Sequence, residues 1–284
     1  MDLTKLSAAK LWLISSPTTT ASRRDADAPR DLPYLATGLY ALVPVTSPDI
    51  TTMTVDERWR VYINPHWFDA ATTQQVGHGL AHLLWHLLAD HADRARSLSV
   101  DSQTARHWAK AADVCIASTL DTDHLSPGDL PNAADLDLPA ALSAEEYYAI
   151  LSKLPPRPDT EIGALGPTDG CGSGSDGVPR THELPPDAET GIDLPEARDI
   201  RRRVAIDYRL HAKQRGNTPG DAWRWARQIL EPRIAWEPLL GQAVRRAIGW
   251  AAGRGDYTYS RPSRRASIFP HIVMPGTRRP VPRV

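Results

Sequence analysis

Hydrophobic residues recur at helical intervals along most of the chain, between polar connections. The intervals predict helices over residues 3–16, 32–45, 73–95, 102–120, 143–153, 196–215, 219–230 and 236–252. Two short runs rich in β-branched and aromatic residues, 50–55 and 59–63, flank Asp56-Glu57 and predict a β-hairpin. The pattern therefore predicts an α+β fold, with a mostly helical body, a small β-hairpin sheet and a helical C-terminal subdomain.

Residues 156–195 interrupt this pattern, because they are rich in Gly, Pro and Asp. A connection of this length is either a linker or a functional strap. It separates a predicted first domain, residues 1–155, from a predicted basic helical subdomain, residues 196–284.

Charge is distributed unevenly between the two parts. Residues 1–196 carry 28 acidic and 14 basic side chains, whereas residues 197–284 carry 6 acidic and 19 basic ones. A basic segment of this kind binds nucleic acid or an acidic partner, or it packs against the acidic part of its own molecule. Because no nucleic-acid recognition motif accompanies it, we favour internal packing.

The composition is that of an ordinary globular protein, with 41% hydrophobic and 24% charged residues. It excludes wholesale disorder and fibrous repeats, and no apolar run is long enough to predict a membrane span. The two cysteines form no disulfide framework, which predicts a reducing, cytoplasmic location. We expect Cys115 to be a buried small residue within a helix, and Cys171 to be an exposed thiol in a Gly-rich loop.

Four of the ten histidines fall within one predicted helix, at positions 78, 82, 86 and 91. At 100° per residue, His78, His82 and His86 form one stripe on a helix that is otherwise apolar. Histidines one helical turn apart project in the same direction and can share one tetrahedral Zn²⁺. Without a metal, the same stripe would be a hydrogen-bonded polar face.

A third ligand has two candidates. His91 lies on nearly the opposite side of the helix from His82, so it can join the site only if the helix ends or bends near Ala89-Asp90. Asp113, on the next predicted helix, would reach the site more easily.

The residues 81–94 (AHLLWHLLADHADR) resemble the zinc-binding helix of a bacterial metallopeptidase-like domain of the zincin type. In that family the domain precedes a von Willebrand factor A-like domain. Further segments resemble the family in the same order: 62–65 (YINP), 108–113 (WAKAAD), 142–148 (LSAEEYY), 171–174 (CGSG) and 256–265 (DYTYSRPSRR). The resemblance implies a zincin-like arrangement with zinc held by His82, His86 and either His91 or Asp113, and a MoxR-type AAA+ ATPase as partner.

Two departures from the family pattern affect function. The family motif is HExxH, whose glutamate is the general base, but Leu83 stands at that position in His82-Leu83-Leu84-Trp85-His86. The register from His78 to His82 lacks the glutamate as well. The sequence also ends at Val284, where the second domain would begin, and has no Asp-x-Ser-x-Ser motif; either the protein lacks that domain or the sequence is a fragment.

We therefore expect a degenerate family member that acts as a metal-stabilised binding or assembly module. The alternative is an active metal-dependent hydrolase with a substitute base, for which Asp90, Glu145 and Glu146 are the nearest candidates, and with the strand 59–63 as an edge for an extended peptide. A weaker alternative is nucleic-acid binding through the arginine clusters at 201–203, 245–246 and 264–265. No membrane partner is expected.

Overall fold

The computed structural model describes residues 2–16, 30–122, 125, 130–153, 170–215, 221–231, 240–245, 256–268 and 271–278. The chain divides into two compact units, Met1–Glu231 and Pro232–Val284. The candidate ligand residues all lie in the first unit. The predicted domain boundaries near residues 155 and 195 stay predictions.

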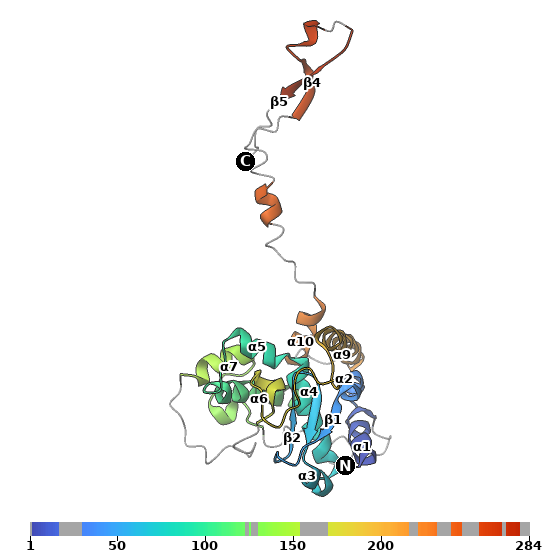
Figure 1. Cartoon of the computed structure of the whole chain (residues 1–284), viewed down its shortest axis with the longest axis vertical. Helices are drawn as coiled ribbons and strands as arrows, with labels where there is room; N and C mark the ends of the chain where they lie inside the picture. Colours follow the sequence, from blue (N-terminus) through green and yellow to red (C-terminus); the bar gives the residue numbers. More distant parts are fainter. Residues whose placement is uncertain are drawn as a thin grey trace. The chain divides into compact units, whose positions relative to one another are not determined.

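Helices make up most of the first unit, around one small sheet (Figure 1). The helices are α1 (Leu3–Ile14), α2 (Ala36–Ala41), α3 (Pro65–Ala70), α4 (Thr73–Leu88), α5 (His91–Ser97), α6 (Ala105–Thr122), α7 (Ala144–Leu151), α8 (Ser173–Asp176), α9 (Leu194–Arg215) and α10 (Asp221–Leu230), with 3-10 turns η1 (Pro33–Leu35) and η2 (Ala134–Leu136). The strands are β1 (Val43–Thr46), β2 (Met53–Val55) and β3 (Arg60–Ile63). The predicted α+β class, mostly helical, is confirmed.

The three-stranded sheet has the order β1-β3-β2. Strand β2 pairs antiparallel with β3, which confirms the predicted hairpin. Strand β1 pairs parallel with β3, with Val43 opposite Arg60. The strand predicted as a free edge over residues 59–63 is therefore the central strand, and that expectation was wrong.

The predicted helix over residues 32–45 was also wrong in its second half. The helical part ends at Ala41, and strand β1 follows. The physical reason lies in Val43, Pro44 and Val45, because β-branched residues favour strands and proline lacks the N–H that a helix interior requires. Proline is tolerated at the edge of a sheet, which is where β1 lies.

Helix α4 begins in a capping box, in which the Thr72 hydroxyl accepts from the Gln75 N–H and the Gln75 side chain accepts from the Thr72 N–H. The predicted single helix over residues 73–95 is divided at Asp90, which has a left-handed backbone (φ 54°). Helix α5 starts at the next residue, His91. The break gives His91 a direction that a continuous helix would not.

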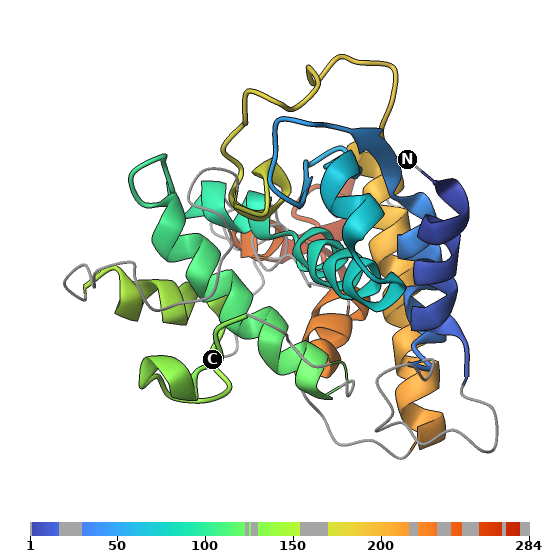
Figure 2. The same cartoon turned by 90° about the horizontal axis from the view of Figure 1, so that it is seen from below.

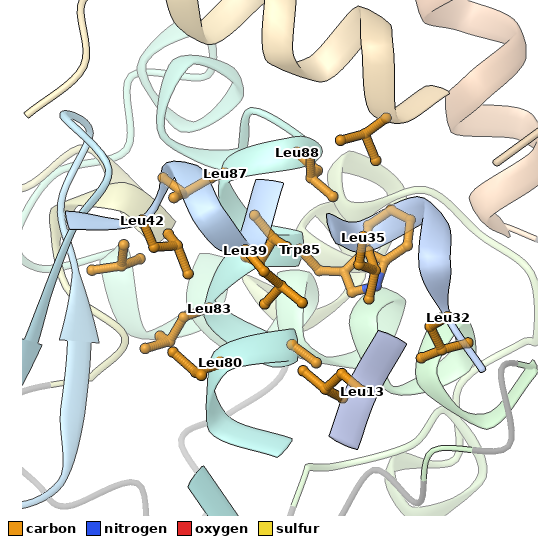
Figure 3. Close-up of a cluster of buried hydrophobic side chains, with 14 of the residues drawn as sticks. Leu13, Leu32, Leu35, Leu39, Leu42, Leu80, Leu83, Trp85, Leu87 and Leu88 are labelled. Carbon is orange, nitrogen blue, oxygen red and sulfur yellow. The ribbon is translucent and has the colours of Figure 1, made fainter. Parts of the chain in front are cut away.

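Helix α4 runs through the middle of the first unit and is buried along most of its length. Helices α1, α2 and α9 lie on one side of it, and α6 and α7 on the other (Figure 2). Figure 3 shows α4 side chains within the largest hydrophobic cluster, together with residues of α1 and α2. Trp225 of α10 packs against this core. Its ring and the Trp85 ring form a T-shaped pair, and its Nε1 donates to the Leu88 carbonyl at 2.8 Å.

Helix α9 begins the basic part of the chain and packs within the first unit. Its Arg201 is buried, donates to the Leu87 carbonyl and pairs with Asp90. Part of the basic segment therefore packs against an acidic side chain of the same molecule, as favoured from the sequence.

The second unit contains a two-stranded antiparallel sheet that the sequence did not predict. It is formed by β4 (Asp256–Pro262) and β5 (Pro275–Arg278), with the 3-10 turn η3 (Ala266–Ile268) between them. Of the predicted helix 236–252, the described residues 240–245 are helical and the remainder lies outside the described residues. Among the helices that the structure describes, none has the length and apolar character needed to cross a membrane.

Candidate metal centre

His82 and His86 project from successive turns of α4 toward one point. Their Nε2 atoms lie 2.9 Å apart, and both side chains are buried. The i, i+4 spacing predicted this approach. His78 lies outside it: its ring packs against Trp12 of α1, with centroids 5.3 Å apart.

Helix α6 brings Asp113 to the same point. Its Oδ1 lies 3.1 Å from the His82 Nε2 and 3.2 Å from the His86 Nε2. Asp113 is buried, so its carboxylate is held between two imidazoles away from bulk water. The acidic residue that the sequence suggested on this helix is thus the one that the structure places here.

Cys171 completes the group, which corrects the expectation of an exposed thiol. Only 1% of Cys171 is exposed, and its Sγ lies 3.6 Å from the His82 Nε2 and 4.0 Å from the Asp113 Oδ1. Its carbonyl accepts from the Val55 N–H of β2 at 2.8 Å. Sequence reasoning missed this residue as a ligand because periodicity does not place a loop. The available signals were a thiol in a Gly-Ser run and the resemblance of residues 171–174 to the family.

The four side chains form a group that could hold a metal ion. One ligand atom from each of His82, His86, Asp113 and Cys171 lies within 4.8 Å of all the others. Around a tetrahedral Zn²⁺ with bonds of about 2.0–2.3 Å, neighbouring ligand atoms are separated by roughly 3.3–3.7 Å. The observed separations bracket these values, and N, O and S are all donors that zinc accepts.

His91 lies outside this group of ligand atoms and contacts the other nitrogen of the His86 ring. Its Nδ1 lies 3.1 Å from the Nδ1 of His86, on the side of that ring away from Asp113. His91 is buried and meets the Trp108 ring edge-on. The structure therefore separates the two candidates for third ligand, with Asp113 at the Nε2 atoms and His91 at the opposite nitrogen.

Burial and mutual contact set the protonation of the group. Burial lowers the pKa of His86 and, more strongly, that of His91, so both rings are neutral at pH 7. Burial alone would raise the pKa of Asp113, but hydrogen bonds from His82 and His86 outweigh it and bring that pKa down to about 2. Burial raises the pKa of Cys171, so the thiol is neutral until a cation displaces its proton.

The family of the chain follows from comparison with known proteins. A family model described as "Putative metallopeptidase domain" matches residues 18–281. The chain belongs to this family. No curated protein and no solved structure matches the chain.

Within this metallopeptidase-like chain, the residue after the first metal-directed histidine is apolar and buried. Leu83 is 3% exposed and belongs to the largest hydrophobic cluster (Figure 3). The side chain packs as part of the core and has no atom that accepts a proton.

The three carboxylates considered as substitute bases are engaged elsewhere. They accept hydrogen bonds as follows: Glu145 from Arg94, Glu146 from Ser143 and Asp90 from Arg201. Each of the three carboxylates is therefore engaged in an ion pair or a helix cap.

Proposed function

We propose that this chain is a non-catalytic member of its metallopeptidase-like family, in which a zinc ion held by His82, His86 and Asp113 stabilises a binding or assembly module. The observation that carries the proposal is Leu83, a core residue at the position where the resemblance expects a general base.

The chemical argument concerns proton transfer. A zinc hydrolase activates water, and a nearby carboxylate takes the proton that the water loses. Loss of such a base typically costs about 10²–10⁴-fold in rate. Leu83 cannot take this role, and the carboxylates of Asp90, Glu145 and Glu146 are already paired.

A bound metal would still contribute to folding. His82 and His86 lie on α4 and Asp113 on α6, so a shared ion would fasten the two helices together. Because such a site does not exist in the unfolded chain, the free energy of metal binding adds to the free energy of unfolding.

The experiment combines metal analysis with a protease assay on the full chain. We expect about one zinc per chain in the wild type, loss of that zinc in His86→Ala, and no zinc-dependent cleavage of casein by the wild type. Leu83→Glu, with Leu83→Gln as the matched control of similar size, tests whether a restored carboxylate confers activity. Cleavage by the wild type that chelation abolishes would contradict the proposal.

The exposed face of α9 supports a partner-binding role. Ile206 and Leu210 are 43% and 57% exposed, and they lie one turn apart on a face that carries Arg202 and Lys213 as well as Asp199. Apolar residues framed by positive charge suit an acidic, partly apolar helix of another protein. We propose such a helix as the partner; the resemblance implies a MoxR-type AAA+ ATPase or a von Willebrand factor A-like domain.

Charge reversal on this face tests the partner. With the MoxR-type ATPase encoded in the same genome as the probe, Arg202→Glu combined with Lys213→Glu should weaken binding about tenfold or more at low salt. The same reversal at Arg106 and Lys153, which are exposed and lie outside α9, is the control. Unchanged binding of the ATPase by the charge-reversed variant would contradict this partner. A wild-type chain that shows a salt-dependent gel shift of nucleic acid but does not bind the ATPase would contradict it as well.

A further inference from the structure

We propose that the thiolate of Cys171 is the fourth ligand of the metal, so that four protein side chains close the coordination shell. The metal would then link α4 and α6 to residues 170–185, which we term the strap. This inference rests on the proposed metal site and adds a ligand from a segment far away in the sequence.

The distances place the sulfur at the open corner of the group. The Nε2 atoms of His82 and His86 and the Oδ1 of Asp113 form a triangle with sides of 2.9–3.2 Å. The Cys171 Sγ stands 3.6–4.0 Å from the two corners at His82 and Asp113, and it lies within 4.8 Å of the third. Sulfur is expected farther out than nitrogen or oxygen, because the Zn–S bond is about 0.3 Å longer than the Zn–N bond.

The backbone beside Cys171 is built to bring the sulfur this close. Gly172 has φ +88°, a backbone conformation that residues with a side chain rarely adopt. A Cβ there would collide with the carbonyl of Val55. Gly174 is similarly close to Val55. The Gly-Ser run therefore lets the strap lie directly on β2, where the Val55 N–H binds the Cys171 carbonyl.

Charge balance gives an independent reason for the fourth ligand. A histidine binds a metal as the neutral imidazole, so His82 and His86 add no charge to the centre, whereas the carboxylate of Asp113 adds one negative charge to a buried group. A divalent cation bound by these three alone would leave one uncompensated positive charge in the interior, which is costly. A thiolate at Cys171 makes the buried centre neutral.

The strap follows the sheet beyond Cys171. The Thr54 hydroxyl lies 3.0 Å from the His182 Nε2, and the Leu184 N–H donates to the Tyr62 hydroxyl at 2.8 Å. The metal would therefore fix the start of a segment whose later part is held by β2 and β3. A closed shell of this kind leaves no position for a reacting water, as in structural zinc sites.

Cobalt substitution tests the ligand directly. The full chain loaded with Co²⁺ should bind one ion and show a thiolate-to-cobalt charge-transfer band in the near ultraviolet. Cys171→Ser and Cys171→Ala should lose the band and weaken the affinity by more than about 100-fold, the upper range for outer-shell changes. Cys115→Ser is the matched control, because the Cys115 thiol is directed to the Leu142 carbonyl and should leave the band unchanged.

The outcomes separate the two proposals. One cobalt per chain without the band, or with a band that survives in the Cys171 variants, would overturn the fourth ligand and leave the metal site standing. No cobalt or zinc binding by the folded wild type would overturn both. Circular dichroism confirms that each variant is folded before its spectrum is interpreted.

Discussion

The contact between His86 and His91 shows how one side chain can set the state of another. If a metal occupies the Nε2 of His86, the proton of that ring must sit on Nδ1, which faces the Nδ1 of His91 at 3.1 Å. His91 then accepts this hydrogen bond and fixes the orientation of the His86 ring. Outer partners of this kind raise the basicity of a ligand and hold its geometry.

Replacing His91 should therefore weaken metal binding without removing a ligand. We predict that His91→Leu lowers zinc affinity about 10–100-fold in competition with a chelating dye, because His86 loses its orienting partner. His78→Leu is the control, since His78 belongs to the same helix stripe but packs against Trp12. Equal losses in both variants would show that His91 acts through helix stability alone.

The residues of the site differed in how far the sequence could reveal them. His82 and His86 followed from helical spacing, which needs no tertiary information. Asp113 and His91 remained alternatives because the break at Asp90 depends on a left-handed backbone in a non-glycine residue, which local propensity does not predict. Cys171 was missed because it lies 58 residues beyond Asp113, on a segment that is positioned by tertiary contacts with β2 and with helices α4, α5 and α6.

Among the elements, β2 and the strap depend on each other. The strap covers β2 through the Val55 N–H, and its Gly172 approaches Val55 more closely than any side chain would allow. The sheet edge is thereby protected from pairing with other chains. The loop thus covers the sheet and also carries a candidate ligand.

Two glycine substitutions compare an open site of the strap with the site that lies against β2. Gly170→Ala meets only the end of Arg180 at 3.8 Å, so it should cost the left-handed strain of about 1–2 kcal/mol in the free energy of unfolding. Gly172, at φ 88° and ψ 178°, lies in a region that is essentially restricted to glycine, and an added Cβ would also collide with Val55, so we predict a clearly larger loss for Gly172→Ala in urea denaturation. Similar losses would mean that the strap does not press on β2.

The elements themselves were predictable where one pattern dominated. The hairpin of β2 and β3 and the capping box at Ser143 were both confirmed. Strand β1 was not found, because its few residues continue an apolar run that also fits a helix, and its partner β3 is parallel and distant in sequence. Short strands of this kind are decided by tertiary pairing rather than by local preference.

For the whole molecule, the proposed metal would add a link between helices that already share a hydrophobic cluster and the strap. Helix α4 belongs to the largest hydrophobic cluster, which α6 joins through Ile116 and Leu120. Helix α6 also contributes Ala111 and Val114 to a separate cluster. The ligand group lies between these helices and the strap. A single ion would therefore bind together α4, α6 and the strap, next to two cores that α6 already joins.

Metal removal should accordingly destabilise the first unit as a whole. When free zinc is about 100 times its Kd, binding contributes about 2.7 kcal/mol to the free energy of unfolding. We predict that chelation lowers the thermal midpoint of the wild type by several degrees and that restored zinc, but not magnesium, reverses the loss. In Asp113→Asn the chelator should have little further effect; a full effect there would exclude Asp113 as a ligand.

X-ray absorption at the zinc edge, on the purified full chain, measures the proposed centre without perturbing it. We predict one zinc per chain with four ligands: three nitrogen or oxygen atoms at about 2.0 Å and one sulfur at about 2.3 Å. A zinc surrounded by five or six oxygen and nitrogen atoms without sulfur, or a folded protein that retains no zinc, would contradict a closed, structural metal centre.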